Sequence, residues 1–135
     1  MTESAPPSAA DGFPRRYGEI LLARAAPLFE QAALAARQAG LNAVVHTAGS
    51  PPELCLEVSA VEHGHASHYR IAADTSRGQV RHQLYFVADG TTRTLEAGLD
   101  SINSMVLDTQ LATLFHDGFA LTLPAVAERH PAGFW

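Results

Sequence analysis

The segment RIAADTSRGQVRHQLYFVADGTTRTLEA, residues 70–97, decides the fold. Apolar and polar residues alternate along it with a period of two, which is typical of half-buried strands. Two turn-forming stretches, Thr75–Gly78 and Asp89–Gly90, interrupt the alternation. Connections this short force neighbouring strands to be antiparallel, because a parallel crossover needs about a dozen residues or more. The segment therefore predicts a run of consecutive antiparallel strands.

The same alternation extends toward the N-terminus, and a different period flanks the strands on both sides. Strands are expected at Leu41–Ala48, Leu54–Glu62, His68–Asp74, Val80–Ala88 and Thr92–Ala97. A helical stripe runs from Pro14 to Ala39, where Pro27 should kink or split the helix. Near the C-terminus, Asp108 is expected to cap a short helix that Gly118 ends.

These elements predict an α+β fold in which an N-terminal helix packs on a four- to five-stranded antiparallel β-meander, with a short C-terminal helix. The single domain is expected to span residues 13–127. Residues 1–12, rich in small polar residues and proline, are expected to be a disordered leader, and residues 128–135 a C-terminal tail.

The turns also predict which strand residues face each other. The turn at 75–78 pairs Ile71 with His82, and the turn at 89–90 pairs His82 with Ala97. The loop at 64–67 pairs His63 with His68 and, in the same register, Ala60 with Ile71. One face then collects the apolar side chains Leu54, Leu56, Val58, Ala60, Tyr69, Ile71, Val80, Leu84, Phe86 and Leu95. The other collects Glu57, Ser59, Arg70, Arg81, Gln83, Thr92, Thr94 and Glu96, so the helix should cover the first face alone.

Composition narrows the class of protein. Of the 135 residues, 47% are hydrophobic and 17% charged, which is a globular composition. The net charge of -5 argues against nucleic acid or an anionic membrane as partner. All nine basic residues are arginine, which is typical of bacteria with GC-rich genomes. A single cysteine, Cys55, and the absence of a signal peptide or an apolar span predict a cytoplasmic location.

His82 is a polar, ionisable side chain on the predicted apolar face. The predicted register places it in a row of residues across the strands, with a small residue at each end of the row. One interpretation is a structural histidine that a core partner satisfies. The alternative is a ligand pocket between helix and sheet, with His82 and the Tyr69 hydroxyl as its polar groups. Such a pocket would make the protein a small-molecule binder or an enzyme.

A second group of histidines, His63, His65 and His68, surrounds a predicted hairpin turn. Three imidazoles can bind Zn²⁺ or Ni²⁺, although this spacing matches no established zinc pattern. Cys55 has no histidine evidently aligned with it, and no nucleophile elbow, P-loop or metalloprotease motif is present. The sequence thus favours a non-enzymatic role and predicts no cofactor.

Three apolar side chains are candidates for contacts with a partner. Leu34 projects from the polar side of the predicted N-terminal helix, and Phe134 and Trp135 end the chain. The order of elements resembles that of bacterial secretion chaperones in outline, without their helix between the third and fourth strands. We therefore expect a protein-interaction module, an adaptor or a chaperone-like homodimer, with the small-molecule pocket and the metal site as alternatives.

Overall fold

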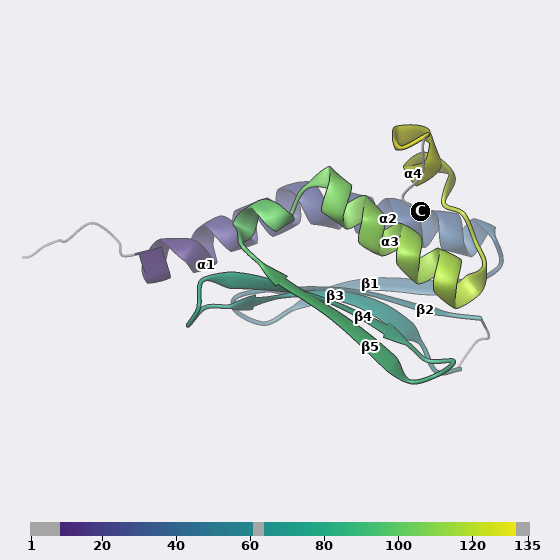
Figure 1. Cartoon of the computed structure of the whole chain (residues 1–135), viewed down its shortest axis with the longest axis horizontal. Helices are drawn as coiled ribbons and strands as arrows, with labels where there is room; N and C mark the ends of the chain where they lie inside the picture. The colour runs from purple at the N-terminus through teal and green to yellow at the C-terminus, as the bar shows by residue number, and fades with distance from the viewer. Residues whose placement is uncertain (1–8, 61–63, 132–135) are drawn as a thin grey trace, which may run out of the picture.

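The computed structural model describes residues 9–60 and 64–131, which form two layers. Figure 1 shows the long helices side by side on one face of a twisted antiparallel sheet, the short last helix on their outer side, and the opposite face of the sheet open. The helices are α1 (Ala9–Ile20), the π-helical η1 (Leu21–Ala25), α2 (Ala26–Gln38), the 3₁₀ turn η2 (Leu99–Ser101), α3 (Ser104–Phe119) and α4 (Pro124–Arg129). The strands are β1 (Asn42–Ala48), β2 (Glu53–Ser59), β3 (Ser67–Asp74), β4 (Gln79–Phe86) and β5 (Thr91–Ala97). The predicted α+β class and the helix-covered meander are confirmed.

The N-terminal helix is divided next to Pro27, as predicted. Pro27 lies in the first turn of α2, and the π-helical turn η1 comes directly before it. Because proline has no amide hydrogen, the regular helical bond at this point cannot form. The predicted split is confirmed. The helix begins at Ala9, however, so residues 9–12 are helical and do not belong to a disordered leader; residues 1–8 lie outside the described part.

In the described part of the chain, the five strands lie in their sequence order, β1-β2-β3-β4-β5. The predicted β3–β4 register is confirmed, since Ile71 faces His82. The β2–β3 register is wrong: Ile71 faces Leu54 and not Ala60. Strand β2 ends at Ser59, and a longer connection joins it to β3. The displacement from 60 to 54 is six residues, an even number, so every side chain stays on its predicted face.

The predicted register of the β4–β5 hairpin is also wrong by an even number of residues. Its turn holds four residues, 87–90, and His82 faces Leu95 where Ala97 was predicted, an even shift of two. Gly90 has φ +72°, a conformation that glycine adopts without steric cost, and its amide donates to the Phe86 carbonyl. The strand therefore stops at Phe86 and not at Ala88.

The C-terminal half is more helical than predicted. Asn103 caps α3 by accepting a hydrogen bond from the Val106 amide, and Ala120 ends the helix in the left-handed conformation. Asp108 is therefore not a cap, and Gly118 lies inside the helix. The buried Asp108 carboxylate instead accepts two bonds from the Arg129 guanidinium, at 2.8 Å each. This ion pair ties α4 to α3, so residues 128–130 belong to the domain and not to a free tail.

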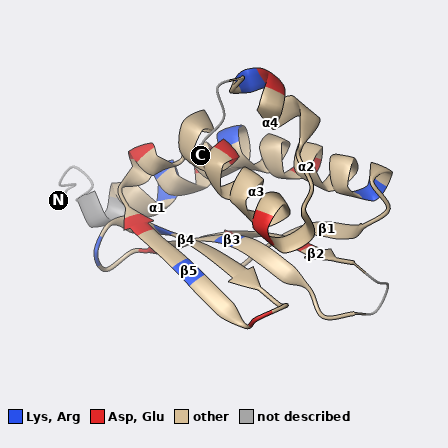
Figure 2. Ribbon diagram, turned by 45° about the vertical axis from the view of Figure 1, so that its right-hand side comes forward, with Lys and Arg blue, Asp and Glu red and all other residues tan. Residues whose placement is uncertain are grey.

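The core lies between the layers. The helices contribute Phe13, Tyr17, Leu21, Phe29 and the buried faces of α2 and α3, and the sheet contributes the apolar face predicted for it apart from Ala60 and Leu95, which are exposed. α2 packs on β1 and β2, and α3 packs on β3 and β4. Acidic and basic residues are interspersed over both layers (Figure 2). Within the described residues, no helix is long and apolar enough to cross a membrane.

Candidate functional site

His82 lies under the helix layer and is 1% exposed. The Tyr69 hydroxyl is 2.7 Å from its Nδ1, and the Ser101 hydroxyl is 2.8 Å from its Nε2. Ser101 donates its own hydrogen to the Gly98 carbonyl at 2.7 Å, so its oxygen accepts from His82. We therefore assign the neutral tautomer with the hydrogen on Nε2, with Tyr69 donating to Nδ1.

This arrangement satisfies the imidazole completely in its neutral form. Burial lowers the pKa of His82 from 6.5 to about 4, and burial raises the pKa of the Tyr69 hydroxyl well above its usual value. Tyr69 was expected near His82, whereas Ser101, which the 3₁₀ turn after β5 places on the second ring nitrogen, was not expected from the sequence. Because both nitrogens have buried partners, the geometry favours the structural interpretation over a ligand pocket at His82.

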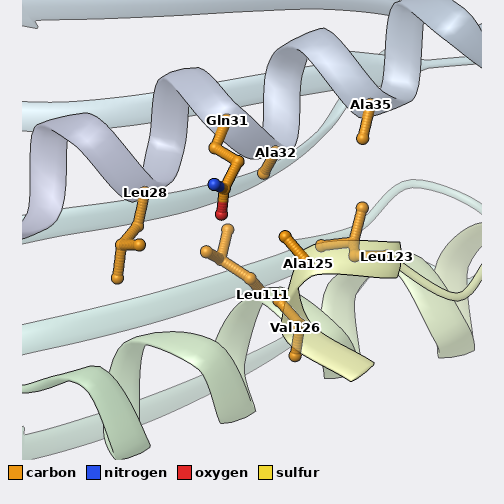
Figure 3. Close-up of a pocket in the computed structure, with 8 residues that line it drawn as sticks. All are labelled: Leu28, Gln31, Ala32, Ala35, Leu111, Leu123, Ala125 and Val126. Atoms are coloured by element: carbon orange, nitrogen blue, oxygen red, sulfur yellow. The ribbon is translucent and has the colours of Figure 1, made fainter. Parts of the chain in front are cut away.

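A crevice between α2, α3 and α4 also leaves little room for a ligand. Figure 3 shows its apolar side chains pointing toward one another, with Gln31 among them. Its volume is about 10 Å³, and it is lined by Leu28, Gln31, Ala32, Ala35, Leu111, Leu123, Ala125 and Val126. That space admits at most one water molecule. The crevice is therefore part of the packing between helices.

The predicted histidine cluster is partly described. His63 lies outside the described residues, and His65 is exposed in the connection before β3. His68 lies on the open face of the sheet, where it faces Glu57 across the strands and its ring stacks on Tyr85 at 5.4 Å. Burial lowers the pKa of His68. The β2–β3 register thus places a carboxylate opposite His68, where a second imidazole was expected.

The open face carries a different group of side chains, which was not predicted from the sequence. His46 on β1 lies directly opposite Cys55 on β2, and Glu57 follows two residues later on the same face. His46 Nε2 is 3.6 Å from a Glu57 carboxylate oxygen. Burial raises the pKa of the Cys55 thiol, and the neighbouring Arg70 guanidinium acts in the opposite direction. Cys55 therefore does have an aligned histidine, contrary to expectation.

The least covered part of the sheet is its last strand. β5 forms the edge opposite β1 (Figure 1), and its first six side chains, residues 91–96, are all exposed. Leu95 points to the helix side of the sheet but remains 39% exposed. The helices pack mainly over β1 to β4, and α3 reaches β5 through the ion pair between Asp117 and Arg93.

Two hollows lie where β5 passes α3, and together we call them the β5 groove. The first has a volume of about 210 Å³ and is lined by Leu84, Arg93, Thr94, Leu95, Gln110 and Thr113. The second, of about 280 Å³, lies between the β4–β5 turn and the end of α3 and is lined by Ser67, Phe86, Val87, Ala88, Asp89, Thr91, Arg93, His116, Asp117 and Gly118. Arg93 lines both hollows. Its guanidinium lies 4.8 Å from the centre of the Phe86 ring and binds Asp117 at 3.1 Å.

Of the side chains predicted to contact a partner, Leu34 is exposed on α2, as expected. Phe134 and Trp135 lie outside the described residues. Comparison of the chain with protein-family models, with curated proteins and with solved structures finds no match in any of the three. The arguments for function therefore come from the geometry of this chain.

Proposed function

We propose that this protein is a protein-interaction module that binds an extended segment of a partner along β5. The observation that carries the proposal is the exposed edge strand, which lies beside a groove that the helix layer leaves open. In this mode of recognition, backbone hydrogen bonds add the partner as a further strand, and alternate side chains enter pockets beside the edge.

The composition of β5 suits such pairing. Edge strands that avoid association carry proline, charged side chains, especially lysine, or bulges. β5 reads Thr-Thr-Arg-Thr-Leu-Glu-Ala, which lacks proline and is rich in β-branched residues. Its two charges have partners within the domain, because Arg93 binds Asp117 and Glu96 binds Arg81 at 3.2 Å. This composition favours pairing of the backbone edge of β5 with another strand.

The groove supplies the specificity that an edge alone lacks. Side chains of an added strand that point toward the helix layer would lie beside Thr91, Arg93 and Leu95, the helix-side residues of β5 that line the groove together with Leu84 and Phe86. These positions favour small or medium apolar side chains, with the α3 side chains Gln110 and Thr113 as hydrogen-bonding groups at the rim. The opposite edge strand, β1, differs because α2 packs against it.

The partner segment can belong to another protein or to a second copy of this chain. In the second case, two β5 strands would pair antiparallel, which gives the homodimer expected from the sequence. A twofold axis at Thr94 would place Arg93 opposite Leu95 and would bring no like charges face to face. Both cases use the same edge, so one pair of variants tests them together.

The test compares Leu95→Asp with the matched control Met105→Asp. Met105 is also exposed, at 55%, but it lies in the first turn of α3 outside the residues that line the groove. Light scattering reports the oligomeric state over a range of concentrations, and selection from a displayed library of random peptides reports binding of extended segments.

We expect self-association, selected peptides or both for the wild-type chain. Leu95→Asp should remove them, because it places a charge where an apolar side chain would pack. Met105→Asp should retain them. A monomer that selects no peptide, or binding that survives Leu95→Asp, would overturn the proposal.

A further inference from the structure

On the open face of the sheet, away from the β5 groove, three side chains with different donor atoms converge. His46, Cys55 and Glu57 present a nitrogen, a sulfur and an oxygen that all lie within 4.8 Å of one another. Strand pairing creates the cluster, because His46 faces Cys55 across β1 and β2, and Glu57 is the next residue of β2 on that face. We propose that this cluster is a Zn²⁺-binding site.

The distances are compatible with coordination. In a tetrahedral zinc site with bonds of about 2.0–2.3 Å, neighbouring ligand atoms are about 3.3–3.7 Å apart. His46 Nε2 and the Glu57 oxygen already lie 3.6 Å apart. The remaining separations, up to 4.8 Å, can close through side-chain rotations of His46 and Glu57, which are about half exposed, toward the buried Cys55. The backbone need not move.

The donor types select the metal. A thiolate together with an imidazole and a carboxylate suits Zn²⁺, whereas Mg²⁺ and Ca²⁺ prefer oxygen ligands alone. Binding releases the Cys55 thiol proton to solvent, because the thiolate is the ligand. Two negative ligands balance the charge of the ion. Three protein ligands leave a fourth position for water or for a group supplied by a bound molecule.

A guanidinium, that of Arg70, also lies beside the cluster. Arg70 lies opposite Cys55 on β3 and bonds toward its sulfur, while its Nε is 3.8 Å from Glu53. This guanidinium is more than a third exposed and can turn toward Glu53 when the metal binds. The proposed site differs from the predicted group of His63, His65 and His68, because the two share no residue.

Titration calorimetry with ZnCl₂ on the metal-free full-length chain tests the site. We expect one Zn²⁺ per chain with a Kd in the micromolar range or tighter. His46→Ala and Cys55→Ser should each weaken binding by about tenfold or more, since even outer partners of zinc ligands contribute that much. His65→Ala, in the connection before β3, is the matched control and should bind as the wild type does.

Cobalt substitution gives a second readout that depends on the sulfur. Co²⁺ bound by a thiolate shows an intense charge-transfer absorption, which Cys55→Ser should remove and His65→Ala should retain. His46 is exposed, so its removal leaves the fold intact and keeps the test interpretable. No binding at 100-fold excess of ZnCl₂, or binding that depends on His65 and not on His46, would overturn the proposal.

Discussion

Mild acid should destabilise this domain through His82, and the structure sets the size of the effect. The unfolded histidine titrates near 6.5, whereas burial lowers the pKa of the folded one to about 4. Between these values the unfolded chain binds more protons, so stability is complete above pH 6.5 and is lost as the pH falls. At full titration the loss is about 3 kcal/mol, and at pH 5 it is about 2 kcal/mol relative to pH 7.

Urea unfolding followed by far-ultraviolet circular dichroism measures the contribution of His82 to the free energy of unfolding when the wild type is compared with His82→Gln. The two chains share every carboxylate, so the difference between their free energies of unfolding isolates the imidazole. We expect the advantage of the wild type at pH 7 to shrink by about 2 kcal/mol at pH 5. Equal pH dependence in both chains would refute the buried neutral histidine.

Three further substitutions test the packing described above. Arg129→Met removes the bidentate partner of the buried Asp108 carboxylate and leaves His130 at 2.8 Å, so it should lower the free energy of unfolding by about 1.5–3 kcal/mol, whereas adding Asp108→Leu should restore much of the loss. Urea unfolding checks this cycle, and an unchanged Arg129→Met chain would contradict it. Asn103→Ala should cost about 1 kcal/mol through the lost cap, with Asn103→Asp close to the wild type in thermal unfolding. His82→Leu removes the partner of two buried hydroxyls and should cost about 1–3 kcal/mol, whereas a pocket histidine would be replaced without loss.

Local patterns were sufficient to predict the layers and the faces of the sheet. The turn at 75–78 is bounded by clear alternation on both sides, so the pairing of Ile71 with His82 followed directly. Alternation past Ser59 does not mark the end of a strand, because a connection can continue the same pattern. The β2–β3 register was therefore wrong by six residues, although the faces were right.

The pairing of His46 with Cys55 could have been predicted from the sequence. The four-residue turn Gly49–Pro52 pairs Ala48 with Glu53, and the same count places His46 opposite Cys55. Applying the turn rule to this hairpin would have found the pair. By contrast, the ion pair between Asp108 and Arg129 joins residues that are 21 positions apart on two helices. Their contact depends on how α3 and α4 pack, which periodicity does not report.

Amide hydrogen exchange in the presence of a peptide selected by the wild-type chain tests the proposed function most directly. If the peptide adds a strand to the sheet edge, new protection should concentrate in β5, with smaller changes in α3 near Gln110 and Thr113. The amides of β1, at the other edge, should exchange as they do in the free protein. Protection that appears along β1 or across the open face, with β5 unchanged, would contradict the account.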